Sequence, residues 1–191
     1  MTQFTKKAIM ETFMELLNRL PLNQITVQMI SDECGISRNT FYYHFGDIYA
    51  LLESTFQVEF EKWQETTKKF PSRKEEVKVA LSFLLEERQA VYNIYDSLNH
   101  QLLEQFIYRV TEDIITERVR TVMGENSLAT EEDIQLITFS YQALFLGLIL
   151  EWIRRGMKDD ISERIVRAEW LFLEGSRLAL SQPRPETSDI E

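Results

Sequence analysis

The apolar residues of this chain recur every three or four positions along most of its length, which is the spacing of one face of an α-helix. A first helix is predicted over residues 4–19, and Pro21 and Asn23 end it. Its apolar positions form one inward stripe that continues just past its end: Ile9, Phe13, Leu16, Leu17 and Leu20. The pattern places the chain in the all-α class.

Two short helices are predicted between Ile25 and Leu51. Thr26 is a good N-cap for the first of them, whose inward face carries Val27, Ile30 and Cys34. Gly35 falls where this helix must end, because a residue past a helix C-terminus often needs a positive φ. Ser37 follows as a second N-cap, and residues 38–45 form the second helix. Two short helices joined in this way are typical of a helix-turn-helix.

The second short helix has two chemically different faces. Phe41 and Phe45 point the same way, toward a core, whereas Asn39 and Tyr43 point in the opposite direction. The remaining positions are polar as well: Thr40 beside that outward face, and Arg38, Tyr42 and His44 on its flanks. In a helix-turn-helix, an outward face of this kind meets the major groove of DNA.

Longer helices are predicted for the rest of the chain. Asp47 caps a helix over residues 48–69, which ends before the linker-like Phe70-Pro71-Ser72. Further helices are predicted over residues 75–98, 101–123, 130–155 and 162–180, and Thr130 to Asp133 resembles a capping box. We therefore expect a helix-turn-helix domain at 1–47, a second helical domain at 48–181, and a disordered tail at 182–191.

Residues 139–153 are apolar on almost all sides of their helix. Such a helix must be covered on more than one side, and in a domain this small a second subunit is the expected second cover. Gly147 would permit a close helix crossing. The residues predicted in this dimer interface are Phe139, Phe145, Leu146, Ile149, Trp152, Ile153 and Trp170. The alternative is a core helix buried within one chain.

The helix-turn-helix segment resembles the TetR family of transcriptional regulators. The resemblance rests on Gly35-Ile36-Ser37, the run from Thr40 to Phe45, Asp47 and Leu51, and it covers about the first quarter of the chain. It implies a homodimer that binds a palindromic double-stranded DNA operator through its N-terminal domain. It also implies a C-terminal helical domain that binds a small effector. Regulators of this family are more often repressors than activators, so a repressor is expected.

The resemblance also assigns DNA contacts, residue by residue. Arg38 and Asn39 would face base edges, because Arg suits guanine and Asn suits adenine in bidentate pairs. Tyr43 would lie against bases or thymine methyl groups. The expected phosphate contacts are Thr26, Ser37, Thr40, Tyr42 and His44, with Lys6 and Lys7 reaching the flanking backbone. For Tyr42, partial packing into the domain is an equally good interpretation.

Two positions depart from the family pattern, since Gly46 and Ile48 stand where relatives commonly carry Lys. Each lost phosphate contact removes a released counterion, so we expect weaker and less salt-dependent DNA binding than is usual. The alternative function is a helical co-regulator or adaptor that binds a protein partner or ligand and has little affinity for DNA.

In the resembled family, effector binding shifts the separation of the two DNA-reading domains by population shift. The effector of this chain is not specified by its sequence. The aromatic residues that could line its cavity are Trp63, Phe83, Tyr92, Tyr95, Phe106, Tyr108 and Tyr141. The alternative for each of them is ordinary core packing.

Charge and composition narrow the function further. The net charge is −10, but residues 1–50 hold four basic and five acidic residues, so the acid lies mostly outside the proposed DNA-reading region. The single cysteine, Cys34, is expected to be a buried structural thiol, and with two histidines in total no metal site is expected. No cofactor is expected either. The chain lacks a Gly-rich phosphate loop and a nucleophile motif, so an enzyme is the least expected class.

The longest stretch without charge, residues 134–150, has 17 residues, short of the ~20 that a membrane-spanning helix needs. No signal sequence is visible at the N-terminus. The expected protein is therefore cytoplasmic, with no membrane partner.

Overall fold

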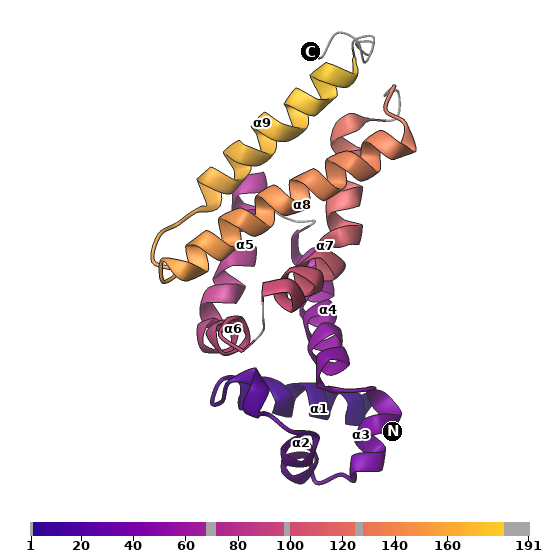
Figure 1. Ribbon diagram of the computed structural model, residues 1–191, viewed down its shortest axis with the longest axis vertical. Coiled ribbons are helices and arrows are strands. Elements are labelled where there is room, and N and C mark those ends of the chain that lie inside the picture. The colour runs from indigo at the N-terminus through magenta and orange to yellow at the C-terminus, as the bar shows by residue number, and fades with distance from the viewer. Residues whose placement is uncertain (1, 68–71, 98–99, 125–127, 182–191) are drawn as a thin grey trace. The chain divides into compact units, whose positions relative to one another are not determined.

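The structure, a computed structural model, describes residues 2–67, 72–97, 100–124 and 128–181, and every regular element in these residues is a helix (Figure 1). The all-α prediction is therefore confirmed. In chain order the elements are α1 (Thr2–Leu17), the 3-10 turn η1 (Leu22–Gln24), α2 (Val27–Cys34), α3 (Arg38–His44), α4 (Ile48–Thr67), α5 (Arg73–Glu86), α6 (Arg88–Tyr95), α7 (His100–Met123), α8 (Glu131–Arg154) and α9 (Ser162–Leu180). The tail predicted to be disordered lies outside the described residues.

The chain forms two compact units, Met1–Phe106 and Ile107–Glu191. In the first unit α1 packs against α2 and α6, α2 against α3, and α5 against both α4 and α6. In the second unit α8 packs against α9. The predicted functional boundary after residue 47 stays a prediction.

Residues 2–45, which hold the three helices α1, α2 and α3 and the turns between them and which we call the head, bury the apolar stripe predicted for α1. Ile9, Phe13 and Leu17 are fully buried, and Leu20 is half-buried. Ile30 of α2 and Phe41 of α3 are fully buried as well. Because all three helices contribute to this interior, the position of α3 is fixed by packing.

Cys34 corrects one expectation, because it is half-buried rather than buried. Its Sγ lies 3.1 Å from Oγ1 of Thr12 and 3.6 Å from the carbonyl oxygen of Ala8, both on α1. Cys34 is the last residue of α2, where the helix leaves the interior, so its thiol lies at the edge of the α1–α2 contact.

The single helix predicted over residues 75–98 is wrong, because the structure has two helices, α5 and α6, that meet at Glu87. Glu87 ends one helix and begins the next: its N–H donates to the carbonyl of Phe83, and its own carbonyl accepts from Val91. Its side chain accepts a hydrogen bond from Asn18 at the end of α1 (2.9 Å). No Gly or Pro marks this break, so packing against α1 decides it.

One cluster of buried residues in the second unit joins three helices: Ile115, Val119 and Met123 from α7, Ile134, Ile137 and Tyr141 from α8, and Leu173 from α9. The capping box at the start of α8 is confirmed, because the Thr130 and Asp133 side chains each accept from the other's backbone N–H (2.8 and 3.2 Å). Gly156, with φ +90°, follows the end of α8 as predicted.

Candidate nucleic-acid interface

The turn between α2 and α3 is built by short-range hydrogen bonds. The Thr26 hydroxyl accepts from the N–H of Met29 (3.2 Å) and caps α2. Gly35 takes the left-handed conformation (φ +66°, ψ +33°), and the next residue, Ile36, donates its N–H to the carbonyl of Ser31 (2.9 Å). Both the N-cap and the glycine turn predicted from the sequence are confirmed.

The start of α3 is fixed in the same way. The Ser37 hydroxyl accepts from the N–H of Thr40 (3.1 Å) and lies 2.9 Å from the Thr40 hydroxyl. Each hydroxyl keeps hydrogen-bonding capacity beyond this pair, because an O–H both donates and accepts. Ser37 and Thr40 therefore place two adjacent hydroxyl groups at the N-terminus of α3, where an anion is favoured.

The two faces of α3 are as the sequence predicts. Phe41 and Phe45 are buried, whereas Asn39 and Tyr43 are exposed, and 76% of Tyr43 is accessible to solvent. Tyr42 is 55% exposed, and its ring stands edge-on to Phe41. The ring of Tyr42 therefore packs partly on the domain while much of it stays accessible, and its contact with a phosphate stays a prediction.

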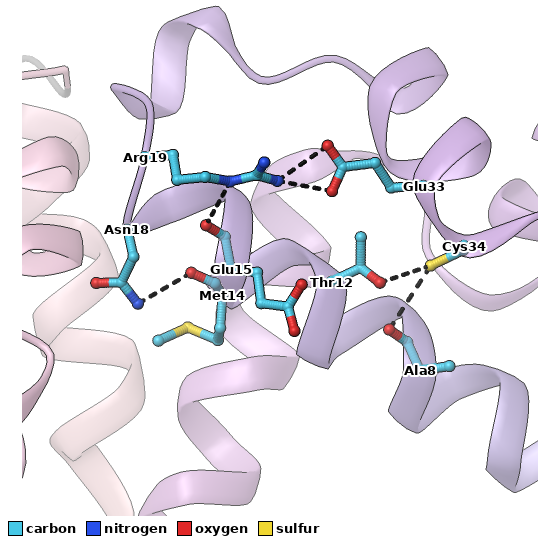
Figure 2. Close-up of polar contacts among 8 residues, drawn as sticks. All are labelled: Ala8, Thr12, Met14, Glu15, Asn18, Arg19, Glu33 and Cys34. Atoms are coloured by element: carbon cyan, nitrogen blue, oxygen red, sulfur yellow. Dashed lines mark hydrogen bonds and ion pairs between the residues drawn. The ribbon is translucent and has the colours of Figure 1, made fainter.

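Most basic side chains of the head already have a partner. Arg19 makes a bidentate ion pair with Glu33 of α2 (2.7 and 2.9 Å), as Figure 2 shows. Lys7 pairs with Glu11 (3.4 Å). The ammonium group of Lys6 lies 5.7 Å from the ring centroid of Phe45. Exposed pairs of this kind are weak and exchange readily for other partners, so the two lysines remain able to contact a phosphate.

The contacts of Arg19 and Cys34 also hold α2 against α1. Figure 2 shows Cys34 pointing to Thr12 and Ala8, and Arg19 reaching both Glu33 and the carbonyl oxygen of Glu15 (3.3 Å). These contacts lie along one side of α1. No pattern in the sequence predicts the Arg19–Glu33 pair, which joins a residue just past the end of α1 to one on α2, 14 positions apart.

The segment after α3 carries little positive charge. Gly46 is exposed, Ile48 is half-buried, and Asp47 uses one carboxylate oxygen to accept from the N–H of Ala50 (2.8 Å). Asp47 is therefore the predicted cap of α4. Arg38 is an exposed basic side chain in the first turn of α3. His44 is half-buried, and its ring stands edge-on to that of Tyr43.

The predicted effector residues are divided between the two units. Phe83, Tyr92, Tyr95 and Phe106 are half-buried in the first unit, and the side chain of Trp63 lies outside the described residues. In the second unit Tyr108 is half-buried and stacks on Phe139 (5.6 Å between centroids). Tyr141 is buried and donates its hydroxyl hydrogen to Glu169 (2.8 Å). The lining of an effector cavity by these residues stays a prediction.

The predicted dimer interface needs correction at four of its seven positions. Leu146, Ile149, Trp152 and Ile153 are already buried within the single chain, so they belong to its core. Phe145 is half-buried. The Trp152 indole also donates to the carbonyl oxygen of Asp159 (2.7 Å), which holds it inside the protomer. Phe139 (58% exposed) and Trp170 (60% exposed) remain accessible.

The structure adds exposed apolar residues that the sequence analysis left out. Leu136 on α8 and Leu171 and Leu178 on α9 are all more than half exposed. Exposed small residues on the same two helices, Ala143 and Gly147 on α8 and Gly175 on α9, leave room for a close approach. We call the surface formed by Leu136, Phe139, Ala143, Gly147, Leu171, Gly175 and Leu178 the α8–α9 face. The sequence pattern alone does not identify this face, because it does not show which side of each helix is buried.

Among the described residues no group of three or more His, Cys, Asp or Glu side chains could hold a metal ion. One described helix, α8, is long and apolar enough to cross a membrane by length and composition. Core helices pass the same test, and 44% of its most apolar window is buried inside the protein. Ile134, Ile137 and Tyr141 of α8 belong to a buried cluster with α7 and α9, which favours a core helix.

Solved structures of regulators share this fold at low sequence identity. One is the dihydroxyacetone kinase operon activator DhaS (20% identity, TM-score 0.59, covering 91% of this chain and 97% of that one). A second is the fatty acid degradation regulator FadR from Bacillus halodurans (16%, 0.58, 90% and 95%). A third is a tetR-family transcriptional regulator from Streptomyces coelicolor (12%, 0.61, 97% and 91%). No curated protein sequence matches the chain.

Two family descriptions match the sequence itself. Residues 9–55 match the bacterial regulatory proteins of the tetR family, and residues 74–172 match a transcriptional regulator C-terminal region. The first match covers the helix-turn-helix built above, and the second alone spans more than half of the chain. The protein belongs to the TetR family of bacterial transcriptional regulators.

Proposed function

We propose that the protein is a homodimeric, sequence-specific DNA-binding repressor in the cytoplasm, whose affinity for its operator is modulated by a small-molecule effector. The observation that carries this proposal is the geometry of α3. Its buried Phe41 and Phe45 anchor the helix, and its exposed Asn39 and Tyr43 present base-reading chemistry on the opposite side.

The proposed DNA contacts follow from that placement. Asn39 and Arg38 read base edges, and Tyr43 lies against bases or thymine methyl groups. Thr26, Ser37 and Thr40 are positioned by their cap hydrogen bonds to hold phosphates. The accessible parts of Tyr42 and His44, together with Lys6 and Lys7, complete the backbone contacts.

The proposed dimer forms through the α8–α9 face. Exposed apolar side chains that lie together on two packed helices are typical of a protein–protein interface. A two-fold dimer places two heads on one DNA duplex, and half-sites about 34–36 Å apart match one helical turn. The operator is therefore expected to be palindromic. An effector is expected to lower DNA affinity by changing the separation of the two heads.

A helical co-regulator with little DNA affinity is the second candidate, and one observation favours it. Of the four basic residues of the head, Arg19 is held in a bidentate pair and Lys7 in a single pair. Arg38, Lys6 and Lys7 are thus the basic residues of each head that can most readily contact a DNA phosphate. Few released counterions mean weak and weakly salt-dependent binding.

The deciding experiment is a fluorescence-anisotropy titration of the protein against the DNA upstream of its own gene, at several salt concentrations and with non-specific competitor. If the protein is a regulator, its DNA binding is saturable and persists in the presence of competitor. Asn39→Ala or Tyr43→Ala then lowers the affinity about tenfold or more. Gln57→Ala, an exposed change on α4, is the matched control and is expected to bind normally.

The co-regulator makes the opposite prediction. Its affinity for any fragment, including those of a wider genomic library, would be no tighter than for random DNA, and Asn39→Ala would change nothing. A result of that kind contradicts the repressor proposal.

A further inference from the structure

One buried carboxylate has no role in the proposed DNA contacts. Glu169 of α9 is only 3% exposed, and each of its two oxygens has its own donor. Nε of Arg118 on α7 donates to Oε1 (2.6 Å), and the hydroxyl of Tyr141 on α8 donates to Oε2 (2.8 Å). We call these three residues the Glu169 clasp, since one side chain joins all three helices of the second unit.

Stability alone does not explain this arrangement. Removing a carboxylate from water costs several kcal/mol, and its attraction to a guanidinium that stays 35% exposed, as that of Arg118 does, often no more than offsets that cost. Well-packed apolar residues of similar volume usually stabilise a fold as well or better. The clasp instead sets the orientation of α9. Its two donors lie on different helices, and both can reach Glu169 in only one rotation of α9 about its own axis.

That rotation decides which residues of α9 reach the surface. Successive residues of a helix are turned by about 100°, so Leu171 lies on the side of α9 opposite to Glu169. By the same spacing Ala143 and Phe139 lie away from Tyr141 on α8. The interior clasp and the α8–α9 face are therefore the two sides of the same pair of helices.

We propose that Glu169 is a positioning residue for the dimer, which holds α9 against α7 and α8 in the rotation that forms the α8–α9 face. The proposal rests on the dimer proposed above. It assigns a role to three side chains that are not among the proposed DNA contacts.

The test is a triple apolar variant of the full chain, Arg118→Met, Tyr141→Phe and Glu169→Met, which removes the clasp and keeps similar volumes. Sedimentation velocity over a range of protein concentrations gives the dimer dissociation constant. The matched control is Arg120→Gln with Glu131→Gln, which removes an exposed ion pair that also joins α7 to α8 (2.6 Å). The denaturant midpoint of each is measured in a monomeric Leu171→Glu background, so that dimer loss cannot itself lower it.

The clasp variant is expected to keep its denaturant midpoint while its dimer dissociation constant rises about tenfold or more. The control is expected to keep both. An unchanged dissociation constant overturns the proposal, and so does a rise that is matched by an equal loss of stability in the monomeric background, because a purely structural role predicts that result.

Two further outcomes are informative. If the triple variant does not fold, Tyr141→Phe alone removes one hydroxyl, and a dissociation constant that stays unchanged in it overturns the proposal. If the wild-type chain stays monomeric at every concentration, both the dimer and the positioning role fail. A wild-type dimer with an unaffected clasp variant removes only the positioning role.

Discussion

The head and the α8–α9 pair both expose large side chains, but the chemistry of the two surfaces differs. On α3 the exposed residues are Arg38, Asn39, Tyr42 and Tyr43, which combine apolar area with hydrogen-bonding groups. On the α8–α9 face Leu136 and Leu171 offer apolar area alone. A polar aromatic surface fits base edges and phosphates, whereas an aliphatic surface with exposed glycines fits a second helix pair.

The two regions are also held together differently. The head is organised by local caps, since Thr26, Ser37 and Asp47 each accept a backbone N–H three residues away. The second unit is organised by a long-range clasp, in which Glu169 binds residues 28 and 51 positions away. Local caps fix where α2, α3 and α4 begin, whereas the clasp joins helices that are distant in sequence.

The largest effect is expected from Phe41→Ala, which tests whether α3 is anchored by its buried face. Loss of a fully buried Phe typically costs about 3–5 kcal/mol of unfolding free energy, so the head should melt. Denaturant unfolding followed by circular dichroism measures it. Tyr43→Ala on the opposite face is the matched control, and equal destabilisation by both changes would contradict the two-faced α3.

Leu171→Glu tests the other surface. A charge in the centre of an apolar interface is expected to raise the dimer dissociation constant about a hundredfold, with little change in the fold of the protomer. Sedimentation velocity measures it. Leu85→Glu on α5 is the control, because Leu85 is also an exposed leucine but lies outside the α8–α9 face; a dimer lost equally in both variants would argue against this face.

Ser37→Ala removes the cap of α3 and is expected to cost about 1 kcal/mol of unfolding free energy. Ser37→Asp retains a cap acceptor and should restore most of that stability. Thermal melts of the three proteins compare them. A melting temperature that is the same for the Ala and Asp variants would mean that the cap contributes little to the head.

The smallest effect is expected from Arg19→Met combined with Glu33→Met. The pair is bidentate, but both side chains are more than a third exposed, so its removal should change unfolding free energy by no more than about 1 kcal/mol. Denaturant midpoints at low and high salt measure it. A loss as large as that of Phe41→Ala would show that this pair, rather than the apolar core, holds α2 on α1.

The features predicted correctly from the sequence are those that depend on near neighbours along the chain. The end of α2 at Gly35 needs one residue with positive φ, and the capping box at Thr130 and Asp133 spans three positions. The division of α3 into a Phe41 face and an Asn39 face follows from helical spacing alone. The same spacing could not tell which side of the wholly apolar α8 is buried, and four dimer residues were misplaced for that reason.

The sequence by itself determined the helical class, the helix-turn-helix and its outward residues, because caps, glycine turns and a clear apolar stripe are encoded within a few positions. Only the tertiary structure decided the break between α5 and α6 at Glu87, where Asn18, just past the end of α1, donates a hydrogen bond to the Glu87 side chain. It also decided that Trp152 lies inside the protomer and that Glu169 has donors on two other helices. Each of these depends on residues distant in sequence, whose proximity arises only when the helices pack.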